Sequence, residues 1–421
     1  MHIFSLRIII DKIVHLWHFI RYYVTMEKKK FHIGLLGRVV IAIILGSSLG
    51  LFMPEWFVRL AMTFNVLFGE FLGFCIPLII IGLVAPGISE LGKSAGKLLL
   101  ITVSIAYGST LFSGFFSYFS CITSYPSLIG GTTQQAVDSE ALSKGAQAFF
   151  SIEMPPLMPV ITALILAFLL GIGMAYIKGN ALKDAVVDFK KIIEKVITSV
   201  IIPLLPFFIF SIFLNLAFSG EIVKIASLFS KVILVIFILH VLVLLVQFTA
   251  AGAIAKKNPF QLLRNMLPAY VTALGTQSSA ATIPVTLRQA IKNGVREEIA
   301  AFVVPLCATI HLSGSTLKIV ACAIAIMMLQ GMEVNTLQFV GFICMLGVIM
   351  VAAPGVPGGA IMASIAVLQS MLGFNSEAIS LMIALYIVMD NFGTACNVTG
   401  DGAIAVVMNK IAKKDIISIS E

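Results

Sequence analysis

Long apolar segments alternate with short polar connections along the chain up to residue 258. Several of these segments reach or exceed the roughly 20 residues that an α-helix needs to cross a bilayer. The pattern predicts spans near residues 33–53, 57–84, 98–120, 157–178, 192–218 and 226–253. The chain is therefore predicted to be an all-α polytopic membrane protein.

After residue 258 the apolar runs are cut by turn residues at mid-depth. Residues 260–294 carry a small polar stretch from Thr276 to Pro284, and residues 340–372 repeat this design around Pro354–Gly359. Polar, non-helical backbone is tolerated at membrane depth only where it is buried in protein or lines a cavity. Each segment is predicted to be a re-entrant helical hairpin. The alternative, surface turns joining four short helices, is disfavoured by how apolar the arms are.

Each predicted hairpin precedes a long apolar helix with polar residues near its middle. These are residues 309–315 in the first helix and 390–401 in the second. The order hairpin then helix occurs twice, which indicates inverted repeats, so the fold prediction is eight transmembrane helices plus two re-entrant hairpins. Such repeats place substrate and ion sites near the bilayer midplane. This region is thus predicted to be the translocating core of a secondary transporter.

Composition agrees with a membrane protein and excludes a water-soluble domain. Hydrophobic residues make up 59% of the chain and charged residues 11%, against roughly 25% charged in soluble domains. Basic clusters alternate with neutral or acidic connections, which predicts a cytoplasmic N-terminus rather than a nucleic-acid partner. The six cysteines lie mostly in apolar spans without CxxC spacing, so they are predicted to be free thiols. No nucleophile–base pair is apparent in the sequence, so the protein is predicted not to be an enzyme.

The first 30 residues are predicted to form an N-terminal cytoplasmic extension. Residues 1–25 show no small-residue cleavage site, which disfavours a signal peptide. Two interpretations stay open for them. Met26 is the true start in one, and in the other the segment is an amphipathic helix at the membrane interface.

The chain from about Phe31 to Lys414 resembles the glutamate transporter homologues, also called dicarboxylate/amino acid:cation symporters, as a divergent member. The strongest match is the string from Asn397 to Asp401. That string belongs to a matching segment from Asp390 to Asp401. The other matching segments are the Ser278–Ser279 tip with Thr282–Thr286, the helix interruption around Gly314 and the Gly355–Gly358 tip. The resemblance implies a homotrimer in a membrane, with the bacterial cytoplasmic membrane favoured.

The resemblance also implies a division into a static scaffold and a mobile transport domain that moves like an elevator. Residues 31–258 would be mostly scaffold, with the third and sixth helices joining the transport domain. Residues 259–414 would form the transport core, whose second hairpin acts as the outer gate, and residues 415–421 a C-terminal tail.

Carried over by position, the resemblance assigns roles to single residues. Asp390 would accept hydrogen bonds from a substrate ammonium, assisted by Thr394, and Asn397 would hold the α-carboxylate. Intramembrane Asp residues are costly and are functional candidates by default. Asp401, with Asn397 and backbone carbonyls near Cys307, would ligate a co-transported sodium ion, and no other cofactor is predicted. The predicted substrate-binding residues are Ser278, Ser279, Ser315, Val356, Gly359, Asp390, Thr394 and Asn397.

Two positions depart from the pattern of members that carry acidic amino acids. Those members place an Arg where this chain has Gly393, and some relatives supply it where this chain has Gln277. A second substrate carboxylate would then be poorly compensated in a low-dielectric site. A neutral amino acid is therefore favoured, and a dicarboxylate or an acidic amino acid is the alternative.

A further departure lies at the first helix interruption, where an amide and a carboxylate ligand of a sodium ion are replaced by His311 and Ser313. Ungapped alignment puts Thr102, Ile105 and Ala106 at the partner positions in the third helix. This sodium site is predicted to be degraded or absent. The tip of the second hairpin is also one residue shorter than the common form.

Two basic residues near that interruption, His311 and Lys318, are possible coupling cations. Each could be a tethered cation, and His311 could carry a coupled proton. The alternatives are a hydrogen-bonded core residue or a snorkelling side chain. The predicted function is a symporter that couples inward movement of an amino acid to sodium and possible proton entry. A non-transporting membrane sensor or an anion-conducting homologue is the rival interpretation.

Overall fold

A computed structural model describes residues 34–93, 97–133, 145–351, 353 and 358–412, and within them every regular element is helical. The predicted extension before residue 31, the tail after residue 414 and Val356 lie outside the described residues. The elements are α2 (Leu35–Leu49), α3 (Glu55–Lys93), α4 (Lys97–Thr133), α6 (Val160–Tyr176), α7 (Ala181–Val196), the π-helical η1 (Ile197–Ile201), α8 (Ile202–Phe218), α9 (Ile222–Ala255), α10 (Pro259–Thr276), α11 (Ser279–Lys292), α12 (Glu297–Ile310), α13 (Ser313–Leu329), α14 (Thr336–Val351), α15 (Gly359–Leu372), α16 (Ser376–Val388) and α17 (Asp390–Ile411).

Several helices are long and apolar enough to cross a membrane, as the hydropathy pattern predicts. In the part of the chain that the structure describes there are five, and the bent pair α16–α17 makes a sixth. Two of the eight predicted spans, α2 and α6, have only 15 and 17 helical residues. The multi-pass character of the chain is confirmed, and the count of eight spans stays a prediction.

Two pairs of short helices occupy the positions of the predicted hairpins. The helices α10 and α11 pack together and are joined at Gln277 and Ser278, and α14 packs against α15. Gln277 has φ of +54°, a left-handed conformation that lets the chain reverse within two residues. Each helix has 18 residues or fewer, which is shorter than a comfortable span. Re-entry into the membrane stays a prediction.

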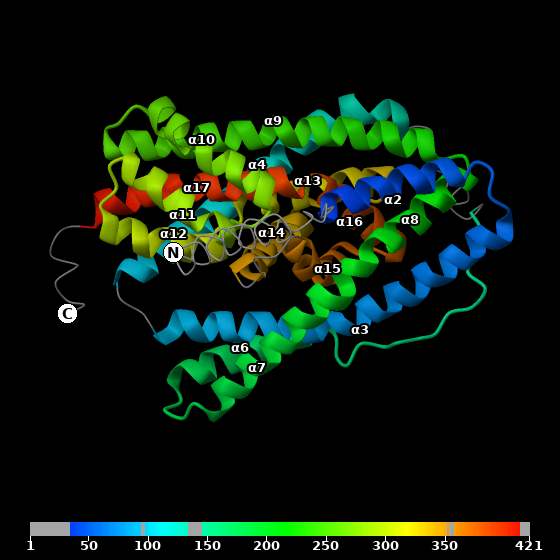
Figure 1. Ribbon diagram of the computed structural model, residues 1–421, viewed down its shortest axis with the longest axis horizontal. Helices are drawn as coiled ribbons and strands as arrows, with labels where there is room; N and C mark the ends of the chain where they lie inside the picture. The colour runs from blue at the N-terminus through cyan, green and yellow to red at the C-terminus, as the bar shows by residue number, and fades with distance from the viewer. Residues whose placement is uncertain (1–33, 94–96, 134–144, 352, 354–357, 413–421) are drawn as a thin grey trace, which may run out of the picture.

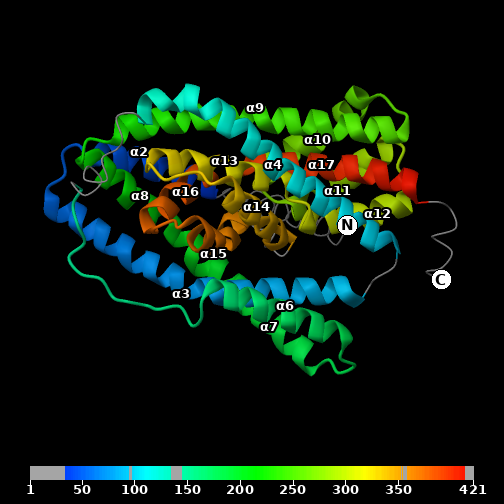
Figure 2. The same cartoon turned by 180° about the vertical axis from the view of Figure 1, so that it is seen from behind.

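The helices form layers along the long axis of the molecule (Figure 1). In both views α3, α6 and α7 form one side, α9 runs along the opposite side, and α13 and α17 lie between them (Figures 1 and 2). On the first side α3 packs against α6, α7 and α8, and α8 packs against α2. The central helix α17 contacts α9, α10, α12 and α13, while α4 packs against α13.

Two interruptions place non-helical backbone in the middle of this central layer. Residues 311 and 312 separate α12 from α13, and a bend of 61° at Met389 separates α16 from α17. Sequence alone predicts one helix through the second point. The two helices that follow these breaks approach closely, because a Cβ atom at Gly314 would lie only 2.6 Å from Cβ of Cys396. Glycine at 314 therefore permits α13 and α17 to meet backbone to backbone.

Candidate functional site

The polar residues of α17 lie on one face of the helix. Asp390, Thr394, Asn397 and Asp401 are spaced by four, three and four residues, which aligns their side chains along one side of an α-helix. All four are buried. Asp390 is the first residue of α17, directly after the bend at Met389, so the bend fixes where its carboxylate points.

Asn397 joins α17 to the start of α13. Its Oδ1 atom accepts hydrogen bonds from the backbone N–H of Gly314 at 2.7 Å and of Ser315 at 3.3 Å. Its Nδ2 atom donates to the Ser315 hydroxyl at 3.0 Å, which also accepts from the Tyr386 hydroxyl at 3.3 Å. The first N–H groups of a helix have no partner within the helix. Asn397 supplies that partner for α13 and so couples the two broken helices.

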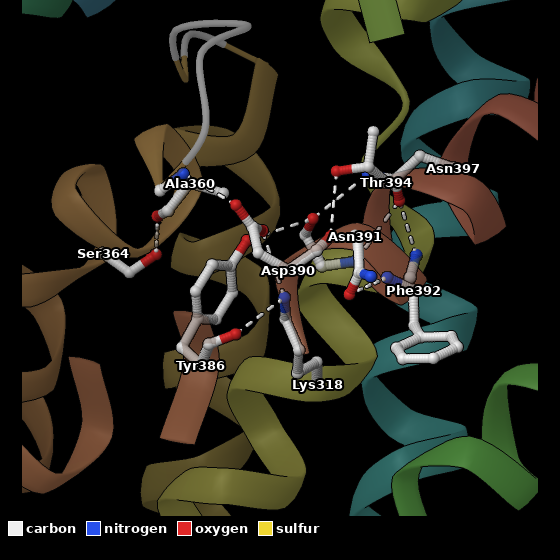
Figure 3. Close-up of polar contacts among 12 residues, drawn as sticks. Lys318, Ala360, Ser364, Tyr386, Asp390, Asn391, Phe392, Thr394 and Asn397 are labelled. Atoms are coloured by element: carbon white, nitrogen blue, oxygen red, sulfur yellow. Dashed lines mark hydrogen bonds and ion pairs between the residues drawn. The ribbon is translucent and has the colours of Figure 1, made fainter. Parts of the chain in front are cut away.

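Asp390 forms an ion pair with Lys318 of α13 (Figure 3). Lys318 Nζ lies 3.2 Å from Asp390 Oδ1, and the other oxygen, Oδ2, accepts a hydrogen bond from the backbone N–H of Gly358 at 2.7 Å. Gly358 has φ of +74° and precedes α15 at the second predicted hairpin. One carboxylate therefore connects α13, α17 and the start of α15.

The Lys318 side chain is fully enclosed, with 0% exposure. Its ammonium donates to the Tyr386 carbonyl at 3.3 Å and lies 3.3 Å from the centre of the Tyr386 ring (Figure 3). A Cβ atom at Gly393 would lie 3.0 Å from Lys318 Nζ. The snorkelling alternative for Lys318 is thus wrong. The ammonium occupies the space beside the position where carriers of acidic amino acids are expected to have Arg.

Asp401 is paired with His311 through a second set of contacts. Nδ1 of His311 lies 2.9 Å from Asp401 Oδ1, and Nε2 lies 3.0 Å from the Ser109 hydroxyl of α4. Gln247 of α9 donates from Nε2 to the same hydroxyl at 3.0 Å and to the Ser313 hydroxyl at 3.2 Å. A neutral imidazole with its proton on Nδ1 satisfies every contact, since Ser109 can then donate to Nε2. Gln247, Ser109, His311 and Asp401 are thus linked in that order by hydrogen bonds, and we call this set the donor chain.

Gly400 leaves space for the donor chain. A Cβ atom there would lie 2.8 Å from both Gln247 Oε1 and His311 Cε1. A second buried histidine, His240 of α9, donates from Nε2 to the Gly314 carbonyl at 3.0 Å. Residues of α4 and α9 therefore complete the polar surroundings of the breaks in α12–α13 and α16–α17.

A cavity of about 30 Å³ lies where these elements meet, at the tip of the first predicted hairpin. It gathers five of the eight predicted substrate-binding residues, namely Ser279, Ser315, Asp390, Thr394 and Asn397. Ser278 caps α11 beside the cavity by accepting from the N–H of Ala281 at 3.3 Å, and Gly359 is buried next to the lining residue Ala360. The remaining lining residues are Gln277, Ala308, Thr309, Leu312, Ala353, Ala360 and Tyr386.

The predicted sodium ligands are placed on helices that pack together, α12 and α17. Oδ1 of Asp401 is already engaged by His311, and the Cys307 carbonyl accepts the His311 N–H at 2.8 Å. The side-chain oxygen of Asn397 is engaged by the α13 amides. The oxygen atoms predicted to bind sodium therefore already accept hydrogen bonds from other groups of the protein. Sodium ligation by Cys307, Asn397 and Asp401 stays a prediction.

Four residues of this site were not identified from sequence: Ser109, His240, Gln247 and Tyr386. His240 and Gln247 stand seven residues apart in the long apolar helix α9, and polar side chains at such spacing inside a span signal a buried polar face. The α4 residue that reaches the break is Ser109. It lies three residues beyond Ala106, the last position of the ungapped alignment, while the Thr102 hydroxyl donates to its own helix at the Leu98 carbonyl.

Comparison with known proteins gives a family match across most of the chain. The family model described as the sodium:dicarboxylate symporter family matches residues 35–411. Excitatory amino acid transporter 3 of Mus musculus is 35% identical over 164 residues, which cover 39% of this chain and 31% of the relative. An excitatory amino acid transporter of Caenorhabditis elegans is 27% identical over 286 residues, covering 66% of this chain and 56% of the relative. The matched stretch spans about a third to a half of the curated relatives.

Proposed function

The chain belongs to the sodium:dicarboxylate symporter family, and on that premise we propose that it is a secondary active symporter that moves a small carboxylate-bearing solute inward together with sodium. The family is one of membrane transporters and not of enzymes. One observation carries the proposal. Asp390, Thr394 and Asn397 of α17, Ser315 of α13 and the first predicted hairpin line one cavity.

The chemistry of the lining supports a carboxylate-bearing solute. Hydroxyls of Ser279, Ser315 and Thr394 and the amide groups of Gln277 and Asn397 surround the cavity. Apart from the Thr394 hydroxyl, which donates to the Asp390 carbonyl at 3.0 Å, these groups offer hydrogen-bond donors to carboxylate oxygens without the desolvation cost of a buried lone charge. Ser278, Gly359 and Val356 retain their proposed place in the cradle, as the resemblance implies.

Sodium is the proposed coupling ion, in line with the family description. Asp401, Asn397 and the carbonyl of Cys307 are its proposed ligands, because hard cations favour oxygen donors. The pairing of Asp401 with His311 supports fewer bound sodium ions than in relatives that retain the amide and the carboxylate at positions 311 and 313. His311 is also the proposed carrier of any coupled proton.

Two groups of helices support the proposed elevator movement. α2, α3, α6, α7 and α8 contact one another along one side, whereas α17 collects the paired helices α10–α11 and α12–α13 together with α9. In this proposal the first group is the scaffold, and the second group together with α4, α14, α15 and α16 is the transport domain. The protein is a homotrimer in a bacterial cytoplasmic membrane. The second predicted hairpin, which contacts Asp390 through Gly358, acts as the outer gate.

Uptake into proteoliposomes tests the proposal. The purified protein is given labelled amino acids, dicarboxylates and monocarboxylates under an imposed sodium gradient, an imposed proton gradient or none. We expect accumulation of at least one carboxylate-bearing solute under the sodium gradient, and loss of that accumulation in Asn397→Ala. Absence of uptake under every gradient would refute the symporter and favour a sensor or an anion-conducting protein.

A further inference from the structure

Lys318 holds the position opposite Asp390 that the resemblance assigns to the amino group of a substrate. Its ammonium is 3.2 Å from Oδ1 of Asp390, and Gly358 N–H is 2.7 Å from Oδ2. Both carboxylate oxygens are therefore engaged by groups of the protein. Asp390 still borders the cavity, with 6% of its surface exposed.

This ion pair is a fixed part of the site. Lys318 is fully enclosed and rests on the Tyr386 ring, and Asp390 supplies the negative charge that its ammonium contacts. Removing one partner of a buried pair leaves an uncompensated charge, which is strongly destabilising. A substrate ammonium that displaced Lys318 from Asp390 would have to leave the lysine unpaired in the interior.

A substrate ammonium that joined the pair without displacing Lys318 would also be disfavoured. Two cations would then share the carboxylate of Asp390, and like charges repel strongly at short range in a low-dielectric interior. The pair of Lys318 and Asp390 carries no net charge, so it neither requires nor attracts an amino group. The neutral donors along the cavity, which include Ser315 and Asn397, can still bind a substrate carboxylate when no substrate ammonium is present.

We propose that Lys318 is the specificity-determining residue of this transporter: by pairing with Asp390 it replaces the substrate amino group, so that the site takes carboxylates that lack an α-amino group. The inference rests on the proposed transport function and deepens it. Lys318 also fills the space beside Gly393, since its Nζ would lie 3.0 Å from a Cβ atom there.

Matched compounds that differ at the α-amino group test the inference. The full-length protein in proteoliposomes is given succinate against aspartate and lactate against alanine, and thermal stabilisation in detergent is measured with the same compounds. For the wild type we expect the amine-free member of a pair to be preferred at least tenfold. A wild type that prefers the amine-bearing member would overturn the inference.

Three variants separate charge from structure. Lys318→Met removes the ammonium but keeps a side chain of similar length, and should shift the preference at least tenfold toward the amine-bearing compounds. Lys318→Met combined with Asp390→Asn leaves a neutral pair, and should restore the amine-free preference even if the single variant folds poorly. Lys224→Met, which removes an ammonium 3.1 Å from Glu221 outside the site, is the control and should keep the wild-type ratio.

The outcomes distinguish the two levels of the proposal. An unchanged ratio in Lys318→Met, or a double variant that prefers amine-bearing compounds, overturns the role of Lys318 and leaves the symporter intact. The role of Lys318 is supported if the wild type takes up the amine-free acid and Lys318→Met takes up its amine-bearing partner instead. Uptake of neither member of any pair overturns the proposed function, and this inference with it.

Discussion

The Nδ1 atom of His311 lies 2.9 Å from Oδ1 of Asp401, and both side chains are buried. This contact joins the break between α12 and α13 to the carboxylate predicted to ligate sodium. A side chain that replaces an amide at position 311 thus changes the surroundings of a different residue, 90 positions later in the chain.

His311→Asn should strengthen sodium binding. The shorter amide withdraws from Asp401, and the freed carboxylate oxygen becomes available to a hard cation. We expect the sodium concentration that half-maximally stabilises the purified protein against heat to fall at least tenfold. His240→Asn is the matched control, because among the described residues His240 bonds to a backbone carbonyl and to no carboxylate. The sodium dependence of this variant should stay near that of the wild type. Equal behaviour of the two variants would contradict the prediction.

Asn397→Ala should lower both stability and substrate affinity. The substitution leaves the N–H groups of Gly314 and Ser315 without their acceptor, and a buried unsatisfied donor costs about 1–3 kcal/mol. Thermal unfolding in detergent and substrate-induced stabilisation measure the two effects.

Asn391→Ala is the control for the loss of stability, because among the described residues the Asn391 side chain accepts a hydrogen bond from its chain neighbour alone, the backbone N–H of Phe392 at 3.0 Å. Its effect on stability should stay below about 0.5 kcal/mol, as for substitutions away from buried networks. A larger loss in Asn391→Ala than in Asn397→Ala would show that the α13 amides do not depend on Asn397.

Gly393→Arg should be poorly tolerated alone and better tolerated with Lys318→Met. The new side chain begins 3.0 Å from the Lys318 ammonium, so the single variant places two cations against one carboxylate. We expect the single variant to unfold at a lower temperature than the double variant. Competition assays on the double variant should show a gain in affinity for aspartate and glutamate. A single variant as stable as the wild type would show that the space beside Gly393 can accept a second cation.

Gly400→Ala should disrupt the donor chain that ends on Asp401. The added methyl would lie 2.8 Å from Gln247 Oε1 and from His311 Cε1, and overpacking of this kind costs about 1–3 kcal/mol. Gly108→Ala on α4 is the matched control, because a Cβ atom there meets nothing within 4 Å. The control should be neutral or slightly stabilising, since alanine is the better helix former. Thermal unfolding of the two variants side by side provides the measurement.

The sequence predicted the parts of the fold that follow directly from the pattern of apolar and polar segments. The six early spans fall on α2, α3, α4, α6, α7–α8 and α9, and the polar tip around Ser278 falls between α10 and α11. The 61° bend at Met389 was not predictable, because no proline or glycine marks it in the sequence and only the packing around α16 and α17 fixes the angle.

The site was predictable where one helix carries it and not where two helices meet. The spacing of Asp390, Thr394 and Asn397 defines a face of α17 without any other element. The partner of Lys318 lies 72 residues away and depends on how α13 is rotated against α17, which hydropathy does not record. For the same reason Ser109 was missed, since a shift of a few residues along α4 changes which hydroxyl reaches His311.

The pairing of Lys318 with Asp390 has a consequence for how membrane voltage acts on the carrier. Moving one elementary charge through a potential of 100 mV changes the free energy by about 2.3 kcal/mol. A lone aspartate carried across the bilayer by an elevator movement would feel that field, whereas the Lys318–Asp390 pair displaces no net charge. This pair therefore adds no voltage dependence to the return of the empty carrier, and the voltage acts on charges outside the pair, such as the carboxylate of Asp401, the solute and its co-transported ion.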